Sequence, residues 1–538
     1  MASWLGRSKM YFDAAERTIP IPLLAATTQP ETNHDNSSST DSPIDGTNTQ
    51  SFLDLCKQAT PPCHLNPLLF NGHVQTFWTA VKGVDIPITY KRKIFESKST
   101  VYGNGGTFAV DFVVHTPKSA RNEAVKDDPT LELPPRTTYY TEEEFSSLGG
   151  DDTKPLLIML HGLAGGSHEI YLRHVLRPLC LDAASDDERW EALVVNARGC
   201  AHSKITSGVL YNARATWDVR QVVLWAKEKW PNRKLFGIGF SLGANILTNY
   251  LGEEGSACPL DAALVVSNPW NLEVSNLILQ STYLGLNVYS KIMADSMRQL
   301  FMRNQKEITS QIPAIDAKKL LSSKYLHEFD RYVQCPTWGW PSVGAYYRDA
   351  SCIDAVIDVR IPLFAIHAKD DPIVADVGAP YEEVKHNGYV VLCSTSLGGH
   401  LSWFEPGGER WFSRVRYISD HEHEANAGVD TRVGLVIIFA AEPVPLSLLL
   451  SYLLTFAFTL STFLSIHHLL FQLTSFKAES WLRKMATEVD FKALRAERET
   501  STVGVQNEMT SSGSPNKREM PVYRGVVRKL QDRVDLVQ

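Results

Sequence analysis

A serine enclosed by two glycines is the most distinctive candidate for chemistry in this sequence. Residues 239–243 read Gly-Phe-Ser-Leu-Gly and begin at the end of the strand-like run KLFGIGFS. A G-x-S-x-G motif between a strand and a helix forms a tight turn that holds the serine in strained backbone geometry. The helix that follows offers the positive end of its dipole and free backbone N–H groups to an oxyanion. This pattern predicts that Ser241 is a nucleophile.

A nucleophilic serine needs a base and an acid, and both are expected after the motif along the chain. His400 lies in a glycine-containing loop after the last strand-like run, YVVLCSTS, and we predict that it is the base. The run PLFAIHAK is followed by two carboxylates, Asp370 and Asp371. The acid of such a triad is usually followed by one variable residue and then an apolar pair, which favours Asp371 over Asp370. A carboxylate there would orient the imidazole and stabilise its cation.

A glycine-rich loop, HGLAGG, after the run PLLIML is predicted to complete the site. Such a loop leaves backbone N–H groups free, so we expect the N–H groups of Leu163 and Leu242 to hold the oxyanion. His161 at the start of the loop is interpreted as structural, holding the loop by hydrogen bonds. The segment Asn71-Gly72-His73 could approach the site, but a structural hairpin near the N-terminus is favoured.

Strand-like and helix-like runs alternate along the chain, and this alternation positions the candidate residues at strand ends. Continuous apolar runs such as ALVVNARG and ALVVSNPW are typical of strands buried in a parallel sheet. Their alternation with helical patterns indicates a mainly parallel central sheet with helices on both faces. Over residues 271–358 the alternation lapses into helical segments and the aromatic stretch CPTWGWPSVGAYY, which predicts a helical lid insertion.

The remaining segments surround one expected catalytic domain at residues 59–425. We expect an N-terminal extension at residues 1–58. It includes a disordered linker at residues 27–50, because that stretch is almost free of large apolar side chains. An acidic, proline-containing surface insertion is expected at residues 117–154.

The C-terminal part of the chain differs in composition from the rest. Residues 433–473 contain a stretch of about twenty uncharged, mainly apolar residues, which is the length needed to cross a bilayer. We therefore expect a membrane-anchor segment at 433–473 and a polar tail at 474–538. The expected location is intracellular and membrane-associated, with the catalytic domain facing the cytosol.

Composition excludes several classes of partner. The formal net charge of −7 argues against a broad basic surface, so no nucleic acid is expected to bind. The eight cysteines are scattered without a C-x-x-C pair, which argues against a zinc site or a disulfide framework. No cofactor and no metal are expected.

The order of these motifs resembles that of the abhydrolase group of the α/β-hydrolase superfamily. This group contains medium-chain fatty acid ethyl ester synthase/esterases, acylglycerol lipases and phospholipase-like membrane hydrolases. The resemblance covers about residues 60–415 and rests on NPLLFNGHVQTFW, HGLAGGSHEIYLR, NARGCAHS, GFSLGANILTNYLGEEG, HAKDDPIV and GGHLSWFE. It implies an α/β-hydrolase fold and maps the family's catalytic residues onto Ser241, Asp371 and His400.

The residues and the resemblance together predict a serine hydrolase or acyltransferase that forms an acyl-enzyme on Ser241. The expected substrate is a carboxylic ester or thioester with a medium- to long-chain, lipid-like acyl group, or an acyl-CoA. Water, or an alcohol acceptor, would then take the acyl group. Two alternatives stay open: an esterase or acyltransferase of a specialised-metabolite pathway, and a non-catalytic membrane-bound scaffold that keeps the fold.

Overall fold

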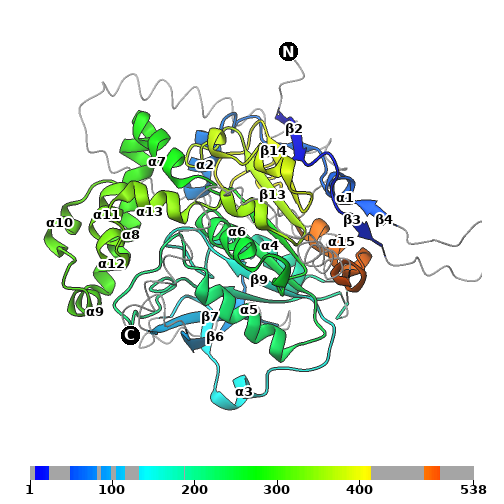
Figure 1. Ribbon diagram of the computed structural model, residues 1–538, viewed down its shortest axis with the longest axis horizontal. Coiled ribbons are helices and arrows are strands. Elements are labelled where there is room, and N and C mark those ends of the chain that lie inside the picture. Colours follow the sequence, from blue (N-terminus) through cyan, green and yellow to red (C-terminus); the bar gives the residue numbers. More distant parts are fainter. Residues whose placement is uncertain are drawn as a thin grey trace, which may run out of the picture. The chain divides into compact units, whose positions relative to one another are not determined.

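A ten-stranded sheet forms the centre of the protein (Figure 1). The computed structural model describes residues 6–23, 49–81, 86–98, 105–115, 133–183, 185–186, 188–412 and 478–496. The strand order is β2-β14-β13-β12-β11-β9-β10-β7-β6-β8. The bounds are β2 (Met10–Ala14), β6 (Thr89–Glu96), β7 (Thr107–Val114), β8 (Thr137–Tyr139), β9 (Leu156–Leu160), β10 (Glu191–Val195), β11 (Leu235–Phe240), β12 (Ala262–Val266), β13 (Leu363–Ala368) and β14 (Val390–Thr395).

The pairing of the strands confirms the predicted fold class. From β10 through β9, β11, β12 and β13 to β14, all neighbours are parallel. β7 pairs antiparallel with both β10 and β6, β2 pairs antiparallel with β14, and β8 is parallel to β6. Helices cover both faces. They are α1 (Phe52–Ala59), α4 (Ile170–Leu176) and α15 (Ala478–Glu488) on one face, and α5 (Trp217–Lys229) and α6 (Leu242–Glu254) on the other.

Side chains alternate along the central strands between two apolar cores. Met159 and Ile238 face the core shared with α1, α4 and α15, whereas Ile158 and Val265 face the core shared with α5 and α6. Both faces of these strands are therefore buried, which explains why their sequences are continuously apolar rather than alternating.

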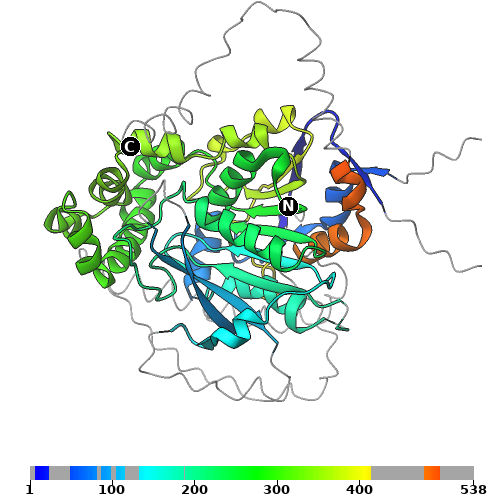
Figure 2. The same cartoon turned by 60° about the horizontal axis from the view of Figure 1, so that its bottom comes forward.

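The segment predicted as a lid, residues 271–358, consists of helices inserted between β12 and β13. These helices gather together beyond the strand ends (Figure 2). They are α7 (Leu272–Ser281), the π-helix η5 (Gly285–Ser290), α8 (Lys291–Arg303), α9 (Gln305–Gln311), α10 (Ala317–Ser322), α11 (Leu326–Tyr332), α12 (Gln334–Trp338) and α13 (Val343–Ala350), followed by the short η6 (Asp354–Asp358).

The structure corrects the expected N-terminal boundary at residue 58. β2 pairs with β14 and so belongs to the central sheet, and α1 buries Phe52 and Leu55 in the core. Strands β1 (Arg7–Ser8) and β3 (Pro20–Pro22) pair with β5 (Cys63–His64) and β4 (Thr49–Ser51). β2 covers the edge of β14, whose backbone groups would otherwise lack strand partners on that side.

The structure adds elements to two further segments. Part of the acidic insertion at 117–154 is structured: β8 extends the sheet beside β6, and α3 (Glu142–Ser146) follows it. Part of the polar tail at 474–538 is also structured, because α15 buries Trp481 and Met485 against the sheet. In both cases the element is too short for its apolar pattern to stand out from polar surroundings.

The proposed anchor at 433–473 and most of the proposed linker at 27–50 lie outside the described residues. Among the residues that the structure does describe, no helix is both long enough and apolar enough to span a bilayer.

A buried ion pair links the antiparallel part of the sheet to the loops that follow β9 and β10. Arg92 on β6 contacts both carboxylate oxygens of Asp111 on β7, at 2.6 and 2.8 Å. Asp111 Oδ2 also accepts hydrogen bonds from Ser167 Oγ (2.6 Å) and Asn196 Nδ2 (2.8 Å). Both charged side chains are fully buried. The carboxylate thus fixes two loops at the carboxyl edge of the sheet.

Replacement of this carboxylate tests its structural role. Asp111→Ala leaves the Arg92 guanidinium buried without its counter-charge, so we expect the free energy of unfolding to fall by about 3–5 kcal/mol. Urea denaturation followed by tryptophan fluorescence measures the change. Glu382→Ala, which breaks an exposed pair with Lys385, is the control and should change stability little. An Asp111→Ala midpoint equal to that of wild type would contradict this role.

Candidate active site

The turn between β11 and α6 holds Ser241 in a strained conformation. Its φ and ψ are 50° and −121°, a region that residues with a Cβ rarely occupy. The flanking glycines allow the turn to form. A Cβ on Gly239 would lie 2.7 Å from the backbone of Ala244, and one on Gly243 would lie 2.5 Å from the carbonyl oxygen of Leu160. Ser241 can therefore stand at the N-terminus of α6 because Gly239 and Gly243 lack side chains.

Ser241, His400 and Asp371 form one hydrogen-bonded series. His400 Nε2 lies 2.9 Å from Ser241 Oγ, and His400 Nδ1 lies 2.8 Å from Asp371 Oδ2. A carboxylate only accepts, so Nδ1–H donates to Asp371 and leaves Nε2 free to accept from the serine hydroxyl. The imidazole is thus in the tautomer that a general base requires.

The neighbouring carboxylates Asp370 and Asp371 have different environments. Asp371 Oδ1 accepts from the backbone N–H groups of Ile373 (2.8 Å) and Val374 (2.9 Å). Burial by itself raises the pKa of Asp371, but the charge and hydrogen bond of His400, with the Val374 N–H, hold that pKa below its ordinary value. Asp371 is thereby kept ionised beside the imidazole.

Asp370 points to the loop before His400 instead. Its Oδ1 accepts from the backbone N–H of Gly399 (3.0 Å), and burial raises its pKa. The structure therefore brings Asp371, and not Asp370, to the imidazole.

The glycine-rich loop after β9 lies beside the turn that carries the serine, since a Cβ on Gly162 would lie 3.3 Å from Ser241 Cβ. Leu163 and Leu242 line the same pocket as Ser241. Leu242 is the first residue of α6, and the N–H groups of a first helical turn have no acceptor within the helix.

His161 holds this loop in place. Its Nε2 accepts from the N–H of Ala197 (3.0 Å), and its Nδ1 lies 2.7 Å from the carbonyl oxygen of Gly162. Burial lowers its pKa to about 4, so the ring is neutral at physiological pH. Both ring nitrogens are occupied by backbone groups, which agrees with the structural interpretation of this residue.

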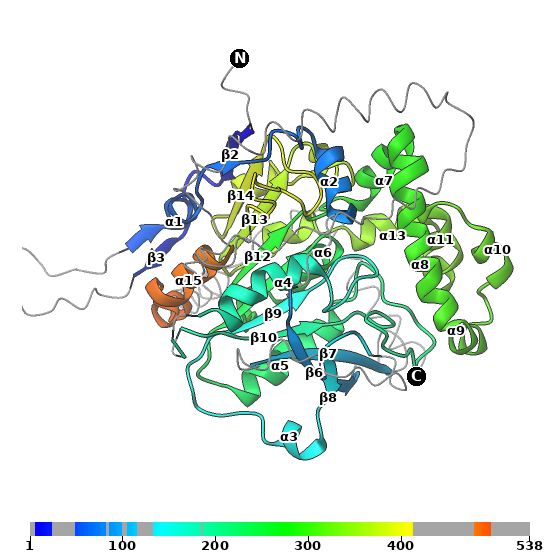
Figure 3. The same cartoon turned by 180° about the vertical axis from the view of Figure 1, so that it is seen from behind.

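Helix α2 (Gly72–Val81) contributes a contact to the site that sequence reasoning missed. The segment Asn71-Gly72-His73 begins this helix, so the favoured hairpin is wrong. Thr76 Oγ1 accepts from the backbone N–H of His400 (2.9 Å) and donates to the carbonyl oxygen of Gly72 (2.7 Å). Figure 3 shows α2 beside β14 and α7. Thr76 lies 324 residues from His400 along the chain, and no local pattern marks such a contact.

The lid helices form the far wall of the pocket above Ser241. Its lining is mainly apolar and includes Leu272 and Leu279 of α7 and Met293 and Met297 of α8. A smaller polar part of the lining comes from α11, α12 and α13. The serine hydroxyl therefore faces a pocket suited to an apolar ligand with a few polar groups.

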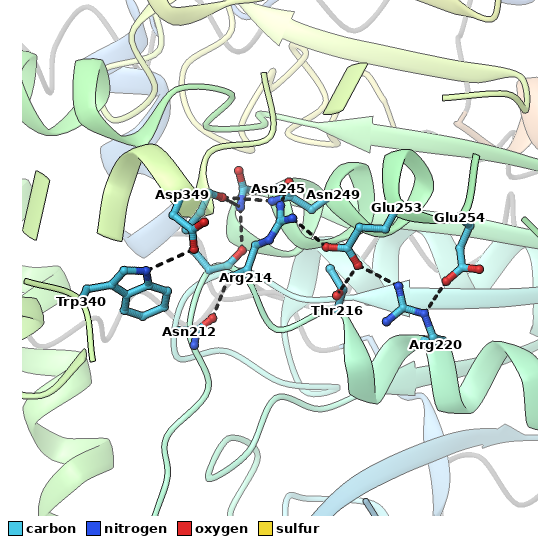
Figure 4. Close-up of polar contacts among 12 residues, drawn as sticks. Asn212, Arg214, Thr216, Arg220, Asn245, Asn249, Glu253, Glu254, Trp340 and Asp349 are labelled. Atoms are coloured by element: carbon cyan, nitrogen blue, oxygen red, sulfur yellow. Dashed lines mark hydrogen bonds and ion pairs between the residues drawn. The ribbon is translucent and has the colours of Figure 1, made fainter. Parts of the chain in front are cut away.

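Hydrogen bonds tie this wall to the helix that carries the serine (Figure 4). Asn245 and Asn249 on α6 both donate to the carbonyl oxygen of Ala350 at the end of α13, at 2.9 and 3.0 Å. Asn245 also donates to the carbonyl oxygen of Ala213 (2.8 Å) in the pocket lining. Arg214 pairs with Glu253 of α6 (3.0 Å). The end of α13 and the loop before α5 are therefore fixed relative to Ser241.

Comparisons with known proteins agree with the fold. A family model described as alpha/beta hydrolase fold matches residues 155–405. A monoacylglycerol lipase of Saccharomyces cerevisiae is 36% identical over 359 residues, covering 64% of this chain and 77% of the relative. Medium-chain fatty acid ethyl ester synthase/esterase 2 of the same yeast is 32% identical, covering 65% of this chain and 83% of the relative. Human phospholipase ABHD3 is 26% identical, covering 60% and 78%.

The contact between Thr76 and His400 generates a prediction about serine reactivity. Thr76→Val keeps the side-chain shape but removes the acceptor of the His400 N–H. We therefore expect about tenfold slower covalent labelling of Ser241 by a fluorophosphonate probe at saturation. The probe concentration giving half-maximal rate should stay unchanged, because only the imidazole moves. Thr76→Ser keeps the hydroxyl and should restore the rate. A Thr76→Val protein that labels at the wild-type rate would show that this contact does not position His400.

Proposed function

The chain belongs to the α/β-hydrolase family, and we propose that it is a serine-dependent carboxylic ester hydrolase that works through an acyl-enzyme on Ser241. The observation that carries this proposal is the hydrogen-bonded series from Ser241 through His400 to Asp371. The names of three relatives support an ester as the bond that is cleaved. Two of the three are esterases or lipases of fatty acyl esters, and the third is a phospholipase.

In the proposed mechanism, Ser241 Oγ attacks the acyl carbonyl while His400 Nε2 takes the hydroxyl proton. Asp371 stabilises the imidazolium that forms, and the N–H groups of Leu163 and Leu242 stabilise the oxyanion. The imidazolium then donates its proton to the leaving alcohol, and the ester C–O bond breaks to leave the acyl group on Ser241. A water molecule, deprotonated by His400, attacks next and releases the acid.

The proposed substrate has a medium- to long-chain acyl group, since the lining surface of the pocket beside Ser241 is mainly apolar and includes Leu, Met and Ile side chains. An alcohol that replaces water in the second step would form a new ester. This acyl-transfer reaction belongs to the proposal because one relative is named an ethyl ester synthase. A thioester such as an acyl-CoA could acylate Ser241 by the same steps.

A lipid surface is the proposed partner of the lid. Apolar side chains are exposed on the outside of α7, η5 and α8, and we call this set the apolar rim: Leu277, Ile278, Tyr283, Leu284, Val288 and Ile292. The opposite faces of α7 and α8 line the pocket beside Ser241. Helices with apolar side chains on both faces could pass a lipid-like ester from a bilayer to the serine.

The apolar segment at 433–473 is proposed as a second membrane contact. All eight cysteines are free, which supports a location on the cytosolic side.

The catalytic assignments are tested with graded variants and a decanoyl ester. Ser241→Ala should abolish cleavage, because loss of the nucleophile costs several orders of magnitude in rate. Asp371→Asn should lower kcat by about 10³- to 10⁴-fold, whereas Asp370→Asn should have a much smaller effect, because only Asp371 contacts His400. Assays with added ethanol, read by mass spectrometry of products, test acyl transfer. More than a few percent of activity left in Ser241→Ala, or a larger loss at position 370, would contradict the assignments.

The membrane contact is tested by flotation with phosphatidylcholine vesicles. We expect the full chain to float, and a chain with residues 433–473 replaced by a flexible linker to bind more weakly. An internal deletion is needed because α15 belongs to the core. In the chain that lacks residues 433–473, the double change Leu277→Ser and Ile292→Ser should remove the remaining vesicle binding, since it removes apolar surface from the apolar rim. Gln280→Ser, an exposed polar change on α7, is the control. A full chain that stays unbound would contradict the proposal.

A further inference from the structure

The pocket beside Ser241 contains a carboxyl group that has no ionic partner among the described residues. Asp330 on α11 lines this pocket and is 6% exposed. Its Oδ2 accepts a hydrogen bond from the hydroxyl of Tyr347 on α13 (2.6 Å). No salt bridge to Asp330 occurs within the part of the chain that the structure describes. Burial raises its pKa to about 7, against a smaller lowering by the Tyr347 hydroxyl. A buried carboxyl of this kind is costly unless a partner satisfies it.

A second polar group with an unused acceptor lies four residues further on. Gln334 lines the same pocket and is 2% exposed. Its Nε2 donates to the carbonyl oxygen of Tyr211 (3.0 Å), and its Oε1 has no partner among the described residues. The orientation of the amide is fixed, because a flipped amide would turn its oxygen toward the Tyr211 carbonyl. The acceptor must therefore point away from Tyr211, and leaving it unpaired costs stability.

The elements that carry these two groups are held firmly around the pocket. Ala213 N donates to the hydroxyl of Tyr346 (3.0 Å) on α13, next to the tyrosine that contacts Asp330. The end of α13 is bonded to α6 through Ala350, as described above. The loop that Gln334 contacts also holds the glycine-rich loop, because Ala164 N donates to the hydroxyl of Tyr211 (2.7 Å). Both acceptors thus have fixed positions relative to Ser241.

We propose that Asp330 and Gln334 bind a hydroxyl group of the ester substrate while its carbonyl lies at Ser241. A hydroxyl can donate to Gln334 Oε1 and can accept from, or donate to, the carboxyl group of Asp330. Other polar side chains, such as Asn276 and Ser290, also line the mainly apolar pocket, but this pair combines a buried carboxyl group with an amide oxygen that has no partner among the described residues. We therefore assign to this pair the contact that separates a hydroxylated ester from a plain alkyl ester of equal length. The inference rests on the proposed ester hydrolase function and adds a specificity determinant to it.

The hydroxyl could belong to the alcohol part or to the acyl part of the ester, and matched substrates separate these sources. Ethyl decanoate is the reference. Monodecanoylglycerol adds hydroxyls to the alcohol, and ethyl ω-hydroxydecanoate adds one to the acyl chain. Decanoylcholine carries a quaternary ammonium instead, which a buried carboxylate beside tyrosine rings could also attract.

Wild type should cleave one of the two hydroxylated esters with kcat/KM about tenfold or more above that for ethyl decanoate. Asp330→Leu and Gln334→Met should each lower the ratio of kcat/KM for the preferred hydroxylated ester to kcat/KM for ethyl decanoate about tenfold. The kcat/KM for ethyl decanoate itself should stay near that of wild type. The hydroxylated ester that shows the preference identifies the source. Asp295→Asn, on the exposed side of α8, is the matched control and should keep the ratio.

Several outcomes would overturn the inference. Equal losses on all esters in the variants would mean that the pair has only a structural role, and a preference for decanoylcholine above both hydroxylated esters would assign the site to a cation. If Asp330→Leu does not fold, Gln334→Met decides, because it removes the amide oxygen that has no partner among the described residues while leaving the contact between Asp330 and Tyr347, and it should lower the ratio without affecting ethyl decanoate. Fluorophosphonate labelling checks the site in each variant. If wild type cleaves none of the esters, the proposed function itself is wrong.

Discussion

The close contact between the start of α6 and the end of β9 is the constraint on which the site depends. Gly243 lies so near the carbonyl oxygens of Leu160 and His161 that any side chain there would overlap them. This contact fixes the turn that strains Ser241 and sets the glycine-rich loop beside it. The strain is maintained by the packing of two buried strands and a buried helix, and not by the turn itself. The geometry of the serine is therefore a property of the whole sheet.

Residues that are remote in sequence from Gly243 position the other parts of the active site. Asp111, on the antiparallel side of the sheet, holds the loops after β9 and β10, and Thr76 on α2 holds the backbone of His400. On the other side of the pocket, Asn245 and Asn249 connect α6 to the lid. The helix that positions the serine thus also positions the wall that faces its substrate. Small errors in the placement of either would alter both reactivity and selectivity.

Local patterns in the sequence predicted the sheet, the serine turn and the helical insertion. Ser241, His400 and Asp371 each follow an apolar strand, and strand ends in a parallel sheet meet at one edge, so their approach could be expected from chain order. The contacts of Thr76, Asp330 and Gln334 could not be predicted, because they depend on how separate helices and loops pack together and not on a local pattern. Strand β2 and helix α15 were assigned outside the domain for a related reason. β2 is recognised as part of the domain only from its pairing with the edge of β14, and α15 only from the packing of its few apolar side chains against the sheet.

The return of the chain to the core at α15 has a topological consequence. Residue 412 ends one described part of the domain, and α15 begins the next at residue 478, where Trp481 packs against Phe364 of β13. Both ends of the intervening segment are thus fastened to the same folded body. The folded core therefore requires residues 412 and 478 to lie on the same side of any bilayer that the protein meets. A single-pass arrangement, with the catalytic domain on one side and the C-terminal helix on the other, is incompatible with this core.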